Sequence, residues 1–140
     1  MATIPRPQAG QVICYRYLWK READKGLVEG QKERPCAVVV ALAGSASEPR
    51  AVVAPITHTK PADPETAIKL TPATQRRLGL DTDQSWIIAS EVNVFHWPGP
   101  DIAQTPTGQY IYGELPEVVF KALKEKILAF APRRLVNRSD

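Results

Sequence analysis

The first strand of the chain is predicted by the alternation of its side chains. In the segment Val12–Trp19, the residues Ile13, Tyr15, Tyr17 and Trp19 fall on one side, because successive side chains of a β-strand point to opposite faces. Aromatic and β-branched residues are also typical of strands. We expect this aromatic face to line the core, and we favour that interpretation over a role in stacking nucleic-acid bases.

Two continuous apolar runs predict two more strands of one buried sheet. They cover Cys36–Leu42 and Ala51–Ile56, and the segment Gly44–Pro49 separates them. A loop this short favours antiparallel pairing of the two strands. The charged segment Lys20–Lys32, which contains two glycines, predicts a flexible loop before the first of these runs.

The middle of the chain is divided into short pieces by prolines. Ala67–Leu70 is expected to form an edge strand, and Thr71 is placed as the N-cap of a short helix over Pro72–Leu78. Ser85–Trp97 is rich in strand-forming residues, and a bend or bulge near Glu91 is expected to divide it into two strands.

The C-terminal part of the chain predicts an irregular segment followed by an amphipathic helix. Pro98–Gly113 has no clear period, whereas apolar residues recur at helical spacing from Val119 to Phe130 with charged residues between them. Pro132 is expected to end this helix and to begin a tail. The whole pattern predicts one mainly β (α+β) domain over residues 1–140. We expect a small, strongly bent antiparallel sheet or barrel with a short helix and a C-terminal amphipathic helix.

Composition is that of one globular domain. The 140 residues, 44% of them hydrophobic, suffice for one core. Eighteen lysines and arginines against 15 aspartates and glutamates give a net charge of +3, which favours a nucleic-acid partner only weakly. Cys14 and Cys36 have no metal-binding spacing and are expected to be reduced, buried thiols. Because no signal-peptide core is found in Met1–Gly10 and no apolar run approaches the roughly 20 residues of a membrane helix, we expect a cytoplasmic protein.

Polar residues that can bind a ligand or take part in a reaction stand at the ends of two predicted strands. Arg34, followed by Pro35, precedes the second predicted strand, and Thr57 follows the third. An arginine guanidinium binds two phosphate oxygens and keeps its charge at neutral pH, and a threonine hydroxyl donates one hydrogen bond to the same group. A phosphate site is therefore one interpretation. The alternatives are a surface ion pair of Arg34 with Glu33 or Glu91, and a turn role for Thr57.

The order of these parts resembles the MazF/PemK (Kid) toxins of bacterial toxin–antitoxin systems. The matching pieces are Arg34–Pro35, Pro55–Thr57 and the acidic Glu91, within a similarity that covers roughly Gly10–Val94 and, more loosely, the terminal helix. The resemblance implies an SH3-like barrel, a homodimer and an acidic antitoxin partner. It also implies an endoribonuclease that cleaves single-stranded RNA without metal or cofactor, through attack of the 2′-hydroxyl that leaves a 2′,3′-cyclic phosphate.

The resemblance also assigns roles to individual residues. Arg34 neutralises charge at the phosphate, Thr57 donates a hydrogen bond to it, and Glu91 occupies the acidic position of the family. The group that transfers the proton is open, with Glu91 preferred over His58 and with His96 lower still.

Basic residues outside these motifs are candidates for binding RNA phosphates. The candidates for substrate binding are Arg76, Arg77 and Lys60. The arginines of the tail either guide RNA or keep the protein soluble; they are Arg133, Arg134 and Arg138.

Two departures from the family pattern motivate other functions. Ala89 stands where some members place an arginine, and the loop Lys20–Lys32 is longer than is common. The main alternative is a noncatalytic module that binds RNA or a protein, in the manner of the gyrase-inhibiting CcdB toxins. A third possibility is a structural, phage- or plasmid-borne domain that keeps the fold without the activity.

Overall fold

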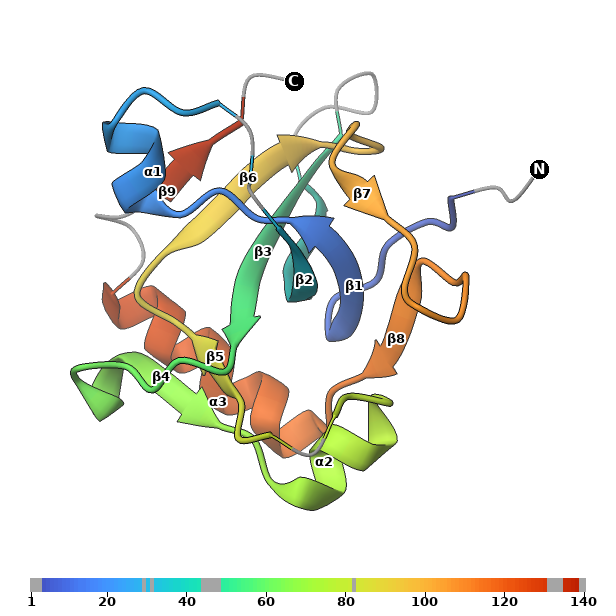
Figure 1. The fold of residues 1–140 in the computed structure, drawn as a ribbon, viewed down its shortest axis with the longest axis vertical. Coiled ribbons are helices and arrows are strands. Elements are labelled where there is room, and N and C mark those ends of the chain that lie inside the picture. The colour runs from blue at the N-terminus through green and yellow to red at the C-terminus, as the bar shows by residue number, and fades with distance from the viewer. Residues whose placement is uncertain are drawn as a thin grey trace.

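Nine β-strands form one sheet in the computed structural model, which describes residues 4–28, 30, 32–43, 49–81, 83–130 and 135–138 (Figure 1). The strands are β1 (Gln11–Arg16), β2 (Glu33–Ala43), β3 (Arg50–Thr57), β4 (Ala67–Lys69), β5 (Trp86–Ile88), β6 (Val92–His96), β7 (Ile102–Ala103), β8 (Ile111–Glu114) and β9 (Leu135–Asn137). The helices of the described residues are α1 (Lys20–Asp24), the 3-10 helix η1 (Pro64–Thr66), α2 (Pro72–Arg77) and α3 (Glu117–Phe130).

The strands pair in an open arrangement. Their order is β4-β5-β3-β2-β1-β7, while β8 also pairs with β1, β6 with β3, and β9 with β6. Every pair is antiparallel except β6–β9, which is parallel. Among the described strands, no pairing joins the two ends of this order. The prediction of a mainly β fold is therefore confirmed.

The predicted antiparallel neighbours are β2 and β3, and this prediction is confirmed. β2 is longer than its apolar run because it begins at Glu33, so Arg34 and Pro35 lie inside the strand. The predicted loop between the two strands, except for Pro49, lies outside the described residues, and so do Pro132, Arg133 and Arg134.

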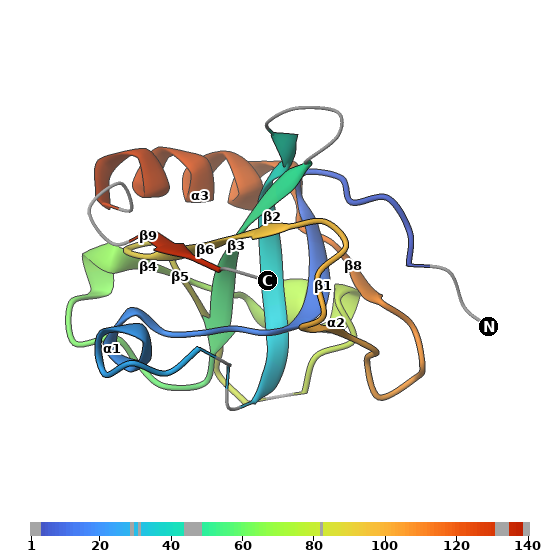
Figure 2. The same ribbon diagram turned by 90° about the horizontal axis from the view of Figure 1, so that it is seen from above.

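The middle parts of β2 and β3 are continuous apolar runs because both of their faces are buried. On one face, Ile56 belongs to a cluster with Leu123 of α3, and Figure 2 shows α3 lying along one side of the sheet. On the other face, Tyr15 stacks on Phe95 with 4.4 Å between the ring centroids. Tyr15 and Tyr17 are fully buried, which confirms their interpretation as core residues.

Two local predictions are confirmed in detail. The Thr71 hydroxyl caps α2 by accepting a hydrogen bond from the Thr74 backbone N–H at 3.1 Å. The segment Ala89–Glu91 divides the predicted strand-rich segment Ser85–Trp97 into β5 and β6, which pair with different parts of β3. β4 lies at the edge of the sheet, as expected. Cys14 and Cys36 are buried and free, and burial raises the pKa of both thiols.

Three segments predicted as irregular contain regular structure. The expected loop Lys20–Lys32 begins with α1, where the Glu22 carboxylate accepts a hydrogen bond from the Trp19 backbone N–H at 3.1 Å and so caps the helix. The expected irregular segment Pro98–Gly113 contains β7 and the start of β8, and the tail contains β9. None of the helices in the described part of the chain has the length and apolar content that crossing a bilayer requires.

Candidate functional site

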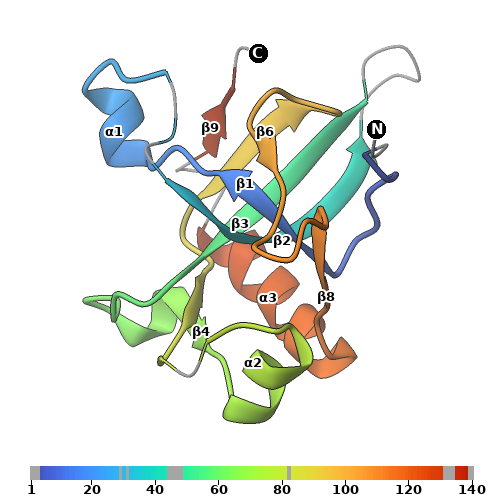
Figure 3. The ribbon, with the colours of Figure 1, turned by 45° about the vertical axis from the view of Figure 1, so that its right-hand side comes forward.

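An open cavity of about 740 Å³ lies where β2 begins and β3 ends. Its wall comes from four segments that are distant in sequence: the start of β2, the end of β3 with the residues after it, the segment after α2, and the β7–β8 connection with β8. β8 lies beside the end of α2 (Figure 3), and a Cβ atom added at Gly113 would lie 3.4 Å from Leu78 Cδ2. Ligand sites in proteins have volumes of this order.

Strand register brings Arg34 and Thr57 together. In the β2–β3 pair, Cys36 lies opposite Pro55, and Arg34 and Thr57 each lie two residues beyond this pair. Antiparallel pairing brings the beginning of β2 to the end of β3, and both residues line the cavity. The two residues singled out at the strand ends therefore belong to one cavity wall.

The guanidinium of Arg34 packs against an aromatic ring, and the Glu22 carboxylate also acts on it electrostatically. The guanidinium lies 5.1 Å from the ring centroid of Trp19, which also has Arg21 at 5.0 Å. Arg34 makes no ion pair with any described carboxylate, and Glu33 lies 3.9 Å from Arg16 instead. The predicted alternative of a surface ion pair is therefore wrong within the described residues.

The electrostatic state of Arg34 suits an anionic ligand. The side chain is half-buried, and its Nε atom is buried without a hydrogen-bond partner in the described structure. Burial lowers the pKa of the guanidinium from its ordinary value, although an arginine remains charged at neutral pH. A buried donor without a partner costs about 1–3 kcal/mol.

The hydroxyl of Thr57 accepts one hydrogen bond within the protein and can still donate one to a ligand. Thr57 Oγ1 accepts a hydrogen bond from the Thr59 backbone N–H at 3.1 Å, so the turn role considered for this residue is real. Because the hydroxyl acts as the acceptor there, its own proton is left to donate. The side chain lines the cavity, so a ligand oxygen in the cavity is a suitable acceptor.

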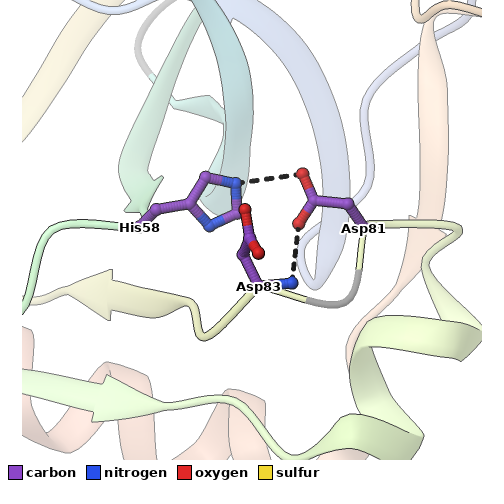
Figure 4. A group of neighbouring side chains, drawn as sticks. All are labelled: His58, Asp81 and Asp83. Atoms are coloured by element: carbon purple, nitrogen blue, oxygen red, sulfur yellow. Dashed lines mark hydrogen bonds and ion pairs between the residues drawn. The ribbon is translucent and has the colours of Figure 1, made fainter.

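His58 lines the cavity and contacts Asp81 (Figure 4), Gln84 and Ser85. Its Nδ1 atom lies 3.0 Å from the Gln84 carbonyl oxygen and 3.1 Å from Ser85 Oγ. Its Nε2 atom lies 3.2 Å from Asp81 Oδ2. β3 ends at Thr57, so the chain has left the strand before His58, and both side chains can serve one site.

Glu91 does not line the cavity. Its carboxylate is buried, accepts a hydrogen bond from the Tyr17 hydroxyl at 3.1 Å, and accepts another from the Lys20 backbone N–H at 2.9 Å. Burial, followed by the charge of Glu91, raises the pKa of Tyr17 well above its ordinary value, so the hydroxyl keeps the proton that it donates. The structure therefore gives Glu91 a role in holding α1 against the sheet.

The predicted substrate-binding residues lie outside the cavity wall. Arg76, Arg77 and Lys60 are exposed, and Arg76 and Arg77 form the last turn of α2, as expected for outward-facing residues. The basic residues that do line the cavity are Arg34 and Lys32. His96 is exposed at the end of β6 and does not line it.

The tail residue Arg138 is neither a surface residue nor a phosphate guide. It is 5% exposed and forms an ion pair with Asp101 at 2.5 Å. It also donates hydrogen bonds to Tyr15 Oη at 3.1 Å, to the Arg16 carbonyl oxygen at 3.0 Å and to Asn93 Oδ1 at 3.2 Å. Neither guiding RNA nor keeping the protein soluble fits Arg138, and both predictions are wrong for this residue. Its guanidinium is buried and binds acceptors inside the fold.

Two acidic residues near His58 were missed in the sequence. The donor atoms of His58, Asp81 and Asp83 all lie within 4.8 Å of one another, and all three side chains are exposed. Nitrogen and carboxylate ligands of this kind suit a divalent metal ion, so these residues could hold one. The Asp-x-Asp spacing was the available signal, but only the fold brings it beside a histidine 23 residues earlier.

The chain matches no protein-family model, and a comparison with curated proteins finds no significant match. Function is therefore inferred from the fold and from the geometry of the cavity.

Proposed function

We propose that this protein is a metal-independent endoribonuclease of the MazF/PemK type that cleaves single-stranded RNA. The observation that carries the proposal is that Arg34, which makes no ion pair with a described carboxylate, and the Thr57 hydroxyl line one cavity from two neighbouring strands. Both lie in a cavity that also holds a histidine. Those three groups are a charge neutraliser, a hydrogen-bond donor and a proton acceptor, and cleavage of a phosphodiester needs all three together with a proton for the leaving oxygen, which water can supply.

The chemistry follows from these groups. The 2′-hydroxyl oxygen of RNA attacks the adjacent phosphorus, its proton passes to a base, and the bond from phosphorus to the 5′-oxygen breaks. The departing 5′-oxygen takes up a proton, and a 2′,3′-cyclic phosphate remains. Arg34 stabilises the charge that builds on the phosphoryl oxygens, and Thr57 donates one hydrogen bond to them.

We assign the base to His58 rather than to Glu91. The Gln84 carbonyl oxygen can only accept, so a hydrogen bond to it places a proton on Nδ1, and in the neutral ring Nε2 is then unprotonated and can act as the base. The contact of Nε2 with the Asp81 carboxylate is attractive only when Nε2 carries a proton, and because it is exposed, a substrate hydroxyl can take its place beside the neutral ring. After proton transfer, the Asp81 carboxylate stabilises the imidazolium that has formed.

The finer parts of the proposal rest on the family resemblance. They are an SH3-like form of the bent sheet, a homodimer, a cytoplasmic location and an acidic antitoxin partner. Arg34 and Lys32, which line the cavity, would attract an acidic polypeptide segment that covers it.

The test is cleavage of long single-stranded RNA by purified protein in EDTA. We expect cleavage to persist in the chelator, the products to end in a 2′,3′-cyclic phosphate, and His58→Ala to lower the rate by about 100-fold. RNA that stays intact would reject the proposal. Binding of RNA without any cleavage would instead support the noncatalytic module considered above.

Replacement of Glu91 by glutamine separates the two candidate bases. Because Glu91 holds Tyr17 and Lys20, we expect Glu91→Gln to lower the free energy of unfolding by about 1–3 kcal/mol. The cleavage rate of the folded variant should stay within a few-fold of that of the unaltered protein. Urea unfolding and cleavage kinetics would be measured on the same sample, with the exposed Glu117→Gln as a control. A 100-fold loss of rate in a stably folded Glu91→Gln would return the catalytic role to Glu91.

A further inference from the structure

The connection between β7 and β8 forms a part of the cavity wall that the proposed chemistry does not use. Thr105, Thr107 and Gln109 of this connection line the cavity together with Tyr112 of β8. No step of the phosphodiester cleavage requires these groups. A cavity of about 740 Å³ is also much larger than one phosphate group, so it has room for other parts of a nucleotide.

We infer that Thr105–Gln109, together with Tyr112, forms a nucleobase-binding site that selects the base next to the cleaved phosphate. This inference rests on the proposed function and adds the source of sequence preference. Bases in single-stranded RNA are free to be read by stacking and by hydrogen bonds to their edges. The wall offers both kinds of contact.

The turn is held in one conformation by its own hydrogen bonds. The Gly108 backbone N–H donates to the Thr105 carbonyl oxygen at 2.8 Å, and the Thr105 N–H donates to the Gln109 carbonyl oxygen. Thr105 Oγ1 also lies 3.0 Å from Thr107 Oγ1 and accepts from the Gln109 N–H at 3.3 Å. Gly108 has a φ of +85°, which a side chain would oppose. A wall fixed before binding loses little entropy when a ligand arrives.

The same strand positions this wall and the arginine. β1 pairs Tyr15 with Arg34 on one edge, and on its other edge it pairs Cys14 with Ala103 of β7 and Ile13 with Ile111 of β8. The phosphate-binding residue and the turn are therefore both attached to β1. A fixed separation between a phosphate and a base site is what reading a defined position in RNA requires.

Gln109 carries the hydrogen-bonding capacity of the wall. Its side chain is exposed, and its amide makes no hydrogen bond with a described residue. A side-chain amide presents a donor beside an acceptor, which matches two adjacent groups on the edge of a base. Tyr112, with Leu80, adds apolar surface to the same cavity, on which the face of a base can lie.

The experiment compares cleavage of a randomised single-stranded RNA pool by the unaltered protein, Gln109→Ala and Gln109→Glu, with sequencing of the cleaved ends. We expect Gln109→Ala to relax the preference at one position by about 10-fold. A carboxylate only accepts hydrogen bonds, so Gln109→Glu should shift that position toward the bases that carry an exocyclic amino group, which are adenine, cytosine and guanine, and away from uracil. The matched control is Gln104→Ala, an exposed glutamine of the same connection that does not line the cavity.

The outcomes separate this inference from the proposed function. If all four proteins cleave with the same sequence preference, the nucleobase site is wrong while the endoribonuclease assignment stands. If the unaltered protein does not cleave RNA, the endoribonuclease assignment fails, and binding to RNA oligonucleotides that differ in one base decides the inference. A base preference in binding that Gln109→Ala abolishes and Gln104→Ala keeps would support it, and the absence of such a preference would overturn it.

Discussion

Replacement of Arg34 by alanine is expected to lower the rate of RNA cleavage by about 1,000-fold, the upper range for loss of one group that stabilises transition-state charge. The guanidinium belongs to the cavity wall that also contains Thr57, and its buried Nε has no partner in the described structure. Nothing else in that position can neutralise the phosphoryl oxygens as they gain charge. The measurement is single-turnover cleavage of a defined RNA in EDTA.

The folded state should tolerate this substitution. Arg34 contributes no ion pair to a described carboxylate, and its contact with the Trp19 ring is worth about 0.5–2 kcal/mol. Urea unfolding of Arg34→Ala should therefore show a small loss of stability beside the large loss of rate. Arg34→Lys keeps the charge without the planar fork and should fall between the two proteins in rate.

Arg76 provides the matched control for loss of positive charge. It is an exposed arginine on α2 outside the cavity wall, so Arg76→Ala should weaken RNA binding at low salt and leave the single-turnover rate nearly unchanged. Equal rate losses in Arg34→Ala and Arg76→Ala would mean that Arg34 serves general attraction of RNA. That result would contradict the assignment of Arg34 to the reacting phosphate.

The pairing of Arg34 with Thr57 was accessible from sequence because it depends on local structure. Two apolar runs with a short connection give an antiparallel pair, and the pair brings the beginning of one strand to the end of the other. The alternation of aromatic residues in β1 and the cap at Thr71 are equally local signals. Each was predicted from residues a few positions apart.

The position of Glu91 was not accessible in the same way. The residues Ala89–Glu91 interrupt the pairing of β5 and β6 with β3, and such an interruption changes which side of the sheet a residue faces. A bend near Glu91 was predicted, but its length sets the direction of the carboxylate, and no local pattern gives that length. The side chain consequently meets Tyr17 and Lys20 instead of the cavity.

The other features that the sequence did not predict depend on contacts between segments that are distant in sequence. Asp81 meets His58 across 23 residues, and the β7–β8 turn reaches the cavity because both strands pair with β1. β9 is a short strand after a helix, and it pairs in parallel with β6, about 40 residues earlier in the chain. Hydrophobic periodicity predicts burial of a face, but it does not indicate which remote segment covers that face.

Arg138→Ala is expected to destabilise the protein more than any single substitution at the cavity. It removes one partner of a buried ion pair and leaves the Asp101 carboxylate without this partner, a change that costs about 3–5 kcal/mol. The guanidinium also bonds to Tyr15 Oη and Asn93 Oδ1. Those contacts connect the tail to β1 and β6, so the loss should appear as a lower urea midpoint for cooperative unfolding of the whole domain. The exposed Arg77→Ala should change stability by less than about 0.5 kcal/mol.

A second pair of substitutions tests whether the cost comes from the unpaired charge. If it does, Arg138→Met combined with Asp101→Leu should be less destabilising than the sum of the two single changes, because the double variant leaves neither charge buried alone.

Cleavage by Arg138→Ala at a temperature where it is fully folded should match that of the unaltered protein, since the side chain lies inside the fold and not on the RNA path. A stable Arg138→Ala that loses RNA binding would instead return this residue to the surface role considered for the tail. If Arg138→Ala is less stable but each folded molecule still cleaves RNA at the normal rate, Arg138 has a structural role. It would then hold β1 in place and, through β1, Arg34.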